Sequence, residues 1–190
     1  MLKTIVLHGS PNKNMNSDTL TEHFLNGIRK SGDQEVKHFY TNELDIRACQ
    51  GCLHCETSEN HECVIQDDMQ EIYSAYIAAD IIVFATPMYW GYMTAQLKTV
   101  FDRMEALAWK GFSDKTFAVF ITYRHHYEST KAFFERICPH FNVELHVLTC
   151  CTMDLETRKD IPISDRQDKL IEAFELGKKL GTTPRQSAHN

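Results

Sequence analysis

The stretch "DIIVFATP", residues 80–87, indicates the fold more clearly than any other part of this sequence. Residues 81–85 are all apolar, with no polar residue between them. A strand that is buried on both faces shows such a continuous run, whereas a strand with one face in water alternates. Pro87 follows directly, and proline cannot donate a hydrogen bond to a neighbouring strand. The stretch therefore predicts a central strand of a parallel sheet that helices cover on both sides.

Shorter apolar or alternating runs predict four more strands, at residues 4–8, 35–40, 116–122 and 143–148. Between the strands, apolar side chains recur three or four residues apart, as in helices, near residues 20–28, 69–79, 97–104, 133–137 and 170–180. Strands that alternate with helices favour an α/β fold with a parallel sheet. For one doubly wound domain of this size we expect a five-stranded sheet in the flavodoxin-like order 2-1-3-4-5.

Length and composition fit a single domain. The chain has 190 residues, of which 43% are hydrophobic and 24% are charged, as in ordinary globular proteins. We expect one flavodoxin-like domain over residues 1–181 and a disordered polar tail over residues 182–190.

Charge and hydropathy argue against two classes of partner. The formal net charge is -6 and the pI is about 5.9, so no basic face is expected for nucleic acid or anionic lipid. No run of about 18 apolar residues occurs, and we expect no membrane-spanning helix. The apolar run at residues 4–7 is too short for an export signal. We therefore expect a cytoplasmic, reducing location in which disulfides are disfavoured.

The loop after the first strand, "HGSPNKNMNSDTL" (residues 8–20), is suited to a phosphate monoester. In sheets of this order, ligands bind outside the carboxyl ends of the strands, where the first and third strands part. Gly9 permits a tight turn, and hydroxyl and amide groups come from Ser10, Asn12, Asn16, Ser17 and Thr19. The following helix N-terminus adds unpaired N–H groups and a positive dipole end. Alternatively, Ser17 only caps the helix and the asparagines only form the turn.

The loop after the third strand, "TPMYWGYMTAQLKTVFDRM" (residues 86–104), begins with aromatic side chains. Tyr89, Trp90 and Tyr92 are costly to leave in water unless they cover something flat and apolar. Gly91 would let the backbone come close to a ring. A dimer interface could use the same residues. A phosphate site beside an aromatic wall suggests a nucleotide-like ligand with a planar head, and flavin mononucleotide (FMN) fits that description.

The segment "ACQGCLHCETSENHEC", residues 48–63, contains four of the chain's seven cysteines. Cys49, Cys52, Cys55 and Cys63 are separated by two, two and seven residues. Thiolate ligands at this spacing suit a [4Fe-4S] cluster or a structural zinc ion. The cysteines could also be free thiols in a loop over the ligand site. The spacing leaves these three alternatives open.

The segments "GSPNKNMNS", "ACQGCLHC", "CVIQDDM" and "TPMYWGYMTAQLKTVFDRM" together resemble the NADPH-dependent FMN reductase family and its iron-sulfur flavoprotein branch. The likeness extends to "KDIPISDRQDKLIEAFELGKKL", residues 159–180. It implies a flavodoxin-like fold, non-covalently bound FMN, and a homodimer or homotetramer. The likeness is weakest at residues 122–128, where "RHH" (residues 124–126) replaces the glycine-containing stretch expected beside the flavin pyrimidine.

The resemblance also implies a set of cofactor-binding residues. The FMN phosphate would be surrounded by Ser10, Asn12, Asn16, Ser17 and Thr19. The ribityl chain and isoalloxazine ring would be lined by Pro87, Met88, Tyr89, Trp90 and Gly91, with Thr122 in the third loop. The iron-sulfur flavoprotein branch has a compact motif similar to the one formed by Cys49, Cys52, Cys55 and Cys63.

The implied function is that of an NAD(P)H-dependent flavin oxidoreductase. FMN would take a hydride from NADH or NADPH and reduce a quinone-like, nitro- or azo-aromatic or metal acceptor. Because the flavin carries the chemistry, no catalytic residue of the protein is expected. The alternative is an electron carrier in which the four cysteines hold a [4Fe-4S] cluster and electrons pass to a ferredoxin-like partner.

Overall fold

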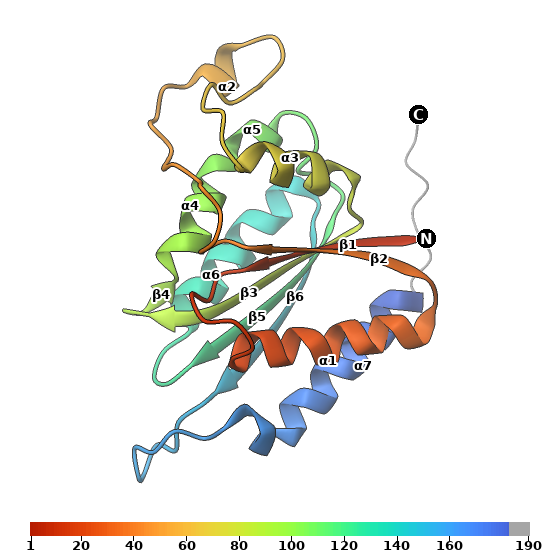
Figure 1. Cartoon of the computed structure of the whole chain (residues 1–190), viewed down its shortest axis with the longest axis vertical. Coiled ribbons are helices and arrows are strands. Elements are labelled where there is room, and N and C mark those ends of the chain that lie inside the picture. The colour runs from red at the N-terminus through yellow and green to blue at the C-terminus, as the bar shows by residue number, and fades with distance from the viewer. Residues whose placement is uncertain (183–190) are drawn as a thin grey trace.

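A computed structural model describes residues 1–182 of the chain and has the expected α/β architecture (Figure 1). The strands are β1 (Leu2–His8), β2 (Gln34–Tyr40), β3 (Ile81–Tyr89), β4 (Tyr92–Met93), β5 (Thr116–Tyr123) and β6 (Glu144–Cys151). The α-helices are α1 (Asn16–Ser31), α2 (His54–Thr57), α3 (Met69–Ala78), α4 (Ala95–Arg103), α5 (Glu105–Ala108), α6 (Glu128–Ile137) and α7 (Gln167–Thr182). The 3₁₀ helices are η1 (Cys138–Phe141) and η2 (Ile163–Asp165).

The sheet has the predicted topology. Its path is β2-β1-β3-β5-β6, and each neighbouring pair on this path is parallel. Counted along the chain without β4, these strands have the order 2-1-3-4-5, so the prediction of a flavodoxin-like sheet is confirmed. The additional strand β4 runs antiparallel to the end of β3. Its two residues are too few to show an alternating pattern in the sequence.

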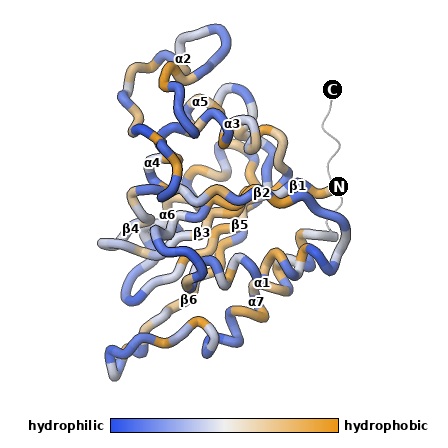
Figure 2. The backbone as a smooth tube through the Cα atoms, in the orientation of Figure 1, coloured by the Kyte–Doolittle hydropathy of each residue, from blue (hydrophilic) through white to orange (hydrophobic). Residues whose placement is uncertain are grey.

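Side chains of β3 enter two hydrophobic cores, one on each face of the sheet. Ile82 and Phe84 pack on the side of α3, α4 and α6, whereas Ile81 and Val83 pack on the side of α1 and α7. These four side chains are buried, and each contributes about 1.5–3 kcal/mol relative to an exposed position. Figure 2 shows hydrophobic residues along the central strands. The continuous apolar run is therefore buried on both faces.

Two further expectations concern the C-terminal tail and membrane-spanning helices. The expected tail, residues 182–190, lies outside the described residues except for Thr182, the last residue of α7. The single domain over residues 1–181 stays a prediction. Among the described helices, none combines the length and the apolarity that a membrane crossing requires.

Helices α1 and α7 come unusually close to each other at two glycines. A Cβ atom added at Gly27 would lie 2.0 Å from the carbonyl oxygen of Phe174, and one at Gly177 would lie 2.0 Å from that of Phe24. Both distances are far below van der Waals contact, so a larger residue at either position would push the helices apart.

Gly177→Ala should lower the free energy of unfolding by at least about 2 kcal/mol, because the strain outweighs the better helix propensity of alanine. Urea unfolding followed by far-UV circular dichroism measures the change. Glu172→Ala, at an exposed position of α7, is the control and should change stability by no more than about 0.5 kcal/mol. A Gly177→Ala chain as stable as the native one would contradict this close approach.

Candidate functional site

The carboxyl ends of β1, β3 and β5 meet at one edge of the sheet, because the parallel ladder pairs His8 with Ala85 and Pro87 with Thr122. A cleft of about 670 Å³ opens at this edge, within the range of about 300–1,000 Å³ that is usual for small-molecule sites. We call it the edge cleft. It is lined by Met15, Asn16, Pro87, Met88, Tyr89, Thr122, Tyr123, Arg124, Thr152, Asp160, Ile161, Pro162, Ile163 and Ser164.

Gly9 ties the loop after β1 to its neighbours. Its N–H donates to the carbonyl oxygen of Ala85 at 2.7 Å, and its own carbonyl accepts from Thr94 Oγ1 at 2.6 Å. A Cβ atom at this position would lie 2.9 Å from the Cβ of Leu97. The loop therefore starts from a fixed point between β3 and α4, and glycine is required there by the close approach of α4.

Asp18, a buried residue in the first turn of α1, also fixes the loop after β1. Its Oδ1 lies 2.8 Å from Nδ1 of His8, and its Oδ2 accepts from the N–H of Asn14 at 2.8 Å. The other ring nitrogen of His8 lies 3.0 Å from Nδ1 of His38. Burial, and then the neighbouring His8, hold the pKa of His38 below its usual 6.5. His8 and Asp18 are both buried, so this network fixes the loop rather than binding solvent.

The N-terminus of α1 is open to an anion. Its N-cap residue is Met15, and in the described chain no side chain caps this helix. Ser17 lies within the first turn, so the alternative that it caps the helix is wrong. The hydroxyl of Thr19 donates instead to the carbonyl oxygen of Met15 at 3.2 Å. The first N–H groups of α1 therefore keep the positive end of the helix dipole available for a phosphate.

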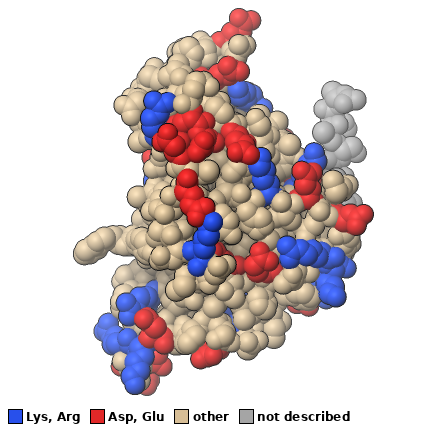
Figure 3. All heavy atoms as spheres, in the orientation of Figure 1, with Lys and Arg blue, Asp and Glu red and all other residues tan. Residues whose placement is uncertain are grey.

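The aromatic residues after β3 form a hairpin that projects from the sheet (Figure 1). Trp90 and Gly91 occupy the turn, both with positive φ (49° and 76°), and the Trp90 side chain is fully exposed. The hydroxyl of Ser129 donates to the carbonyl oxygen of Gly91 and ties the turn to α6. The tip is seen as an uncharged protrusion in Figure 3. Only the base of this hairpin, up to Tyr89, faces the edge cleft.

One wall of the edge cleft consists of Thr122 and of residues that were not predicted to belong to the site. Thr122 was expected at the end of β5, but Tyr123 and Arg124 follow it into the cleft lining, together with Thr152 and residues 160–164. The one available signal was "KDIPIS", residues 159–164, because its proline and isoleucines directly precede the last helical pattern.

The structure thus brings together some of the predicted cofactor-binding residues and sets others apart. Five of them line the edge cleft: Asn16, Pro87, Met88, Tyr89 and Thr122. Ser10 and Asn12 lie in the adjoining loop, where the Ser10 hydroxyl donates to the Asn12 carbonyl oxygen at 2.9 Å. Ser17 and Thr19 lie in the first turn of α1, and Trp90 and Gly91 lie at the hairpin tip. None of the four, and neither Ser10 nor Asn12, is part of the cleft lining.

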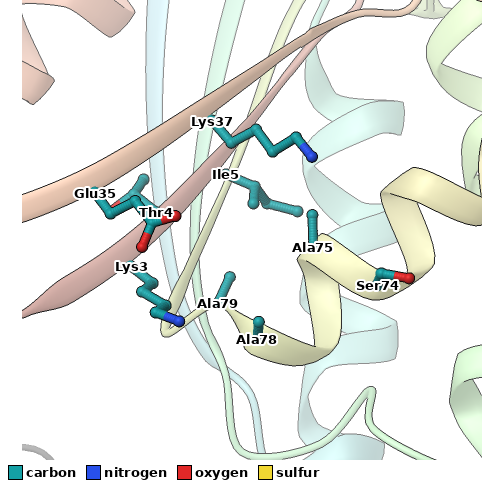
Figure 4. A pocket seen from close by; sticks show the side chains of 9 residues that line it. All are labelled: Lys3, Thr4, Ile5, Glu35, Lys37, Ser74, Ala75, Ala78 and Ala79. Atoms are coloured by element: carbon teal, nitrogen blue, oxygen red, sulfur yellow. The ribbon is translucent and has the colours of Figure 1, made fainter.

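A smaller hollow of about 250 Å³ lies beside α3, away from the carboxyl edge of the sheet (Figure 4). Its lining includes Ile5, Ala75 and Ala78. Lys37, which also lines it, is paired with Glu71 at 2.6 Å. Lys3, Thr4, Glu35 and Ser74 complete its polar lining. The hollow lies toward the amino ends of β1 and β2, opposite the edge at which sheets of this order bind ligands.

The cysteine segment, residues 48–64, forms a separate lobe. We call its base, where Arg47, Ile65 and Asp67 meet Arg103, the neck. Arg103, buried at the end of α4, donates to both carboxylate oxygens of Asp67 at 2.8 and 3.2 Å. The same guanidinium donates to the carbonyl oxygens of Arg47 at 2.8 Å and Ile65 at 3.1 Å. It therefore joins the two chain segments on which residues 48–64 stand. Figure 1 shows this lobe, with α2, projecting beyond α3 and α5.

The four predicted metal-ligating cysteines are divided between the outside and the inside of the lobe. Cys49 and Cys52 are exposed, whereas Cys55 and Cys63 pack partly against the core. Burial, and then the nearby Cys63, raise the pKa of the Cys55 thiol above its usual 9.0. Within residues 1–182 no three His, Cys, Asp or Glu side chains are grouped closely enough to hold a metal ion. The thiols are suitable donors for a cluster, but as arranged they do not form its coordination sphere.

Burial disfavours the Asp67 carboxylate, but hydrogen bonds from Arg103 and from two backbone N–H groups outweigh it and lower its pKa below 3.8. The stabilisation from this depressed pKa is present at neutral pH and is lost as the pH falls through the lowered value. The ion pair between Arg103 and Asp67, which we call the clamp, is therefore retained at neutral pH.

Arg103→Met should leave the Asp67 carboxylate buried without a partner and cost about 3–5 kcal/mol of stability. We expect faster cleavage within residues 48–64, measured by limited proteolysis at pH 7 with mass spectrometry of the fragments. Arg29→Met, which removes an exposed cation of α1, is the control. Native-like resistance of the Arg103→Met lobe would show that the clamp does not hold the neck.

A parallel sheet in this strand order, with a cleft at its carboxyl edge, defines a flavodoxin-like fold with a candidate ligand site. The family model for NADPH-dependent FMN reductases matches residues 2–145. The chain belongs to the NADPH-dependent FMN reductase family.

Among similar proteins is an iron-sulfur flavoprotein of Methanosarcina thermophila, 37% identical over 114 residues that cover 60% of this chain and 58% of that protein. An iron-sulfur flavoprotein of Archaeoglobus fulgidus is 39% identical over 101 residues, which cover 53% of this chain and 50% of that protein. The chain thus matches only about half the length of these curated relatives.

Solved structures share the fold at low sequence identity. An FMN-dependent NADH-azoreductase from Bacillus anthracis, in complex with FMN, has a TM-score of 0.70 at 13% identity, with 95% of this chain and 100% of that chain covered. An NAD(P)H:quinone oxidoreductase from Methanothermobacter marburgensis has a TM-score of 0.65 at 19% identity, with 94% and 98% covered. At these identities the likeness describes the fold alone.

Proposed function

We propose that this chain binds FMN in the edge cleft and acts as an NAD(P)H-dependent flavin oxidoreductase. The observation that carries the proposal is the uncapped N-terminus of α1 beside a cleft of about 670 Å³. Membership of the NADPH-dependent FMN reductase family supports it.

The phosphate end of FMN would be held by backbone rather than by cations. Asn16 lines the cleft at the first residue of α1, and the N–H groups of this turn would donate to a bound phosphate. Lys13, the one cation in the preceding loop, is already paired with Glu43 at 2.7 Å and lies over the ring of Tyr40 at 4.2 Å. Ser10, Asn12, Ser17 and Thr19 would contribute to the loop around the phosphate.

The planar end of FMN would lie between two walls of the cleft. Pro87, Met88 and Tyr89 form one wall, and Thr122 faces them from the next strand, to which Pro87 is paired. Trp90 and Gly91, at the exposed tip, would reach a bound ring only from outside. When bound, FMN supplies hydride and electron transfer between a nicotinamide and a second substrate. The protein's part is to orient the ring and to exclude water, so no side chain is assigned as acid or base.

We further propose a small quinone-like, nitro- or azo-aromatic or metal acceptor, reached through the open side of the cleft. NADH or NADPH would approach the same side as a transient donor. The fully exposed Trp90 at an uncharged tip supports a homodimer or homotetramer, because such residues are enriched at interfaces. We also propose a reducing, cytoplasmic location, in which the seven cysteines would remain thiols.

Titration of the apo-protein with FMN and with riboflavin tests the site. Asn16→Asp places a carboxylate at the expected phosphate position and should weaken FMN binding about tenfold or more by charge repulsion. Riboflavin, which has no phosphate, should bind the variant and the native chain about equally. Absorbance or fluorescence titration measures both affinities.

Asn26→Asp adds the same charge on the exposed face of α1 and should leave both affinities unchanged. If the native chain refuses FMN altogether, the proposed function is wrong. If Asn16→Asp weakens FMN and riboflavin equally, the phosphate does not bind at α1.

The second candidate is an electron carrier that holds FMN and a [4Fe-4S] cluster and passes electrons to a ferredoxin-like partner. Two observations favour it: the matched relatives named iron-sulfur flavoproteins, and four free cysteines in a lobe with its own closed neck. Cys49 and Cys52 would have to move to join Cys55 and Cys63. Gly51 and Leu53, on either side of Cys52, have positive φ (62° and 57°), so the chain turns sharply between Cys49 and Cys55.

Anaerobically purified protein should then contain about four iron and four sulfide per chain, as a [4Fe-4S] cluster requires. Cys52→Ser should abolish the iron while FMN binding is retained, because the lobe and the edge cleft are built from different segments. Cys151→Ser, outside the lobe, should retain both. Iron-free native protein after anaerobic purification and reconstitution with iron and sulfide would rule out this candidate.

A further inference from the structure

Arg124 and Asp160 join two walls of the edge cleft. Nε of Arg124 lies 3.2 Å from Oδ1 of Asp160. Arg124 directly follows β5, whereas Asp160 stands in the connection between β6 and η2. Of the described residues that line the cleft, these two are the only ones with charged side chains.

The ion pair leaves Arg124 available to another anion. The two side chains are 56% and 74% exposed, and ion pairs at such exposure are weak because water competes with them. The guanidinium of Arg124 has five N–H donors that can bind an anion. Arg124 can therefore exchange Asp160 for a negative charge that arises inside the cleft.

The proposed reaction produces such a charge. Hydride transfer moves two electrons and one proton from the nicotinamide to the flavin, so NAD(P)H becomes NAD(P)⁺ and the neutral ring system gains one negative charge. A second proton, taken from water, removes that charge later. Much of the lining is apolar, including Pro87, Met88, Ile161, Pro162 and Ile163, and such surroundings disfavour an unpaired charge.

We propose that Arg124 stabilises the negative charge of reduced flavin in the edge cleft and thereby raises its reduction potential, while Asp160 restrains this effect by pairing with Arg124. The inference rests on the proposed binding of FMN in this cleft. A cation near the ring is one of the means by which a protein tunes a flavin's electronics. Removing each partner should shift the potential in opposite directions.

The test is the midpoint potential of bound FMN, measured by reductive titration against a reference dye, together with the affinity for oxidised FMN. Arg124→Gln should weaken binding of reduced relative to oxidised FMN about tenfold, which lowers the potential of this two-electron couple by about 30 mV. Asp160→Asn should shift the ratio at least about threefold the other way, or about 15 mV upward. Arg124→Lys should retain part of the native effect.

Arg158→Gln is the matched control, because it removes a cation from the same connection as Asp160 but outside the cleft lining. It should leave the potential unchanged. An Arg124→Gln protein that binds FMN at the native potential overturns the inference and leaves the proposed function standing. An Arg124→Gln protein with weaker NADPH binding, unchanged NADH binding and an unchanged potential also overturns it, because Arg124 would then bind the nucleotide phosphate.

If Arg124→Gln cannot hold FMN, Asp160→Asn decides alone, and a potential at or below the native value overturns the inference. A native chain that binds no FMN would instead overturn the proposed function, so the two failures are distinguishable.

Discussion

The register of the parallel ladder determines where each ligand-facing loop begins. Because His8 pairs with Ala85 and Pro87 pairs with Thr122, the first residue beyond each strand lies at the same edge of the sheet. Hydrogen bonds from Gly9 and Thr94 then tie the first loop to β3 and α4. A slip of one strand by a single residue would exchange its two faces. The position of the cleft thus follows from the strand register that buries β3 on both sides.

The two ends of the edge cleft differ in their electrostatics. At the α1 end, Asp18 in the first turn of the helix points inward and is paired with His8 and with the N–H of Asn14. The N–H groups at the helix start are left for an incoming anion. At the other end, the charged pair Arg124 and Asp160 is exposed and weakly held. Under the proposed binding mode, the FMN phosphate would meet fixed backbone dipoles, and the charge of the reduced ring would meet an exposed side chain.

The buried strands could be predicted from sequence because their apolar runs depend on local pattern alone. The run ending at Pro87 predicted the central strand, whereas the phosphate site in the loop after His8 stays a prediction. Arg103 could not be placed, because its partners Asp67 and Arg47 are 36 and 56 residues away and only the tertiary fold brings them together. Trp90 was expected in the cleft wall, yet positive φ in the hairpin turn directs it into solvent. Such turns depend on backbone geometry that residue type does not reveal.

The neck at Arg103 has a consequence for how this protein can diverge. The Arg103 guanidinium holds together the two ends of residues 48–64. The length and composition of the lobe can therefore change without changing the register of the strands. Insertions, deletions or an exchanged metal-binding module between Arg47 and Ile65 would leave the sheet and the edge cleft intact, provided that both carbonyl groups still reach Arg103. The lobe is therefore a natural site for grafting a new metal-binding segment onto an unchanged flavodoxin-like scaffold.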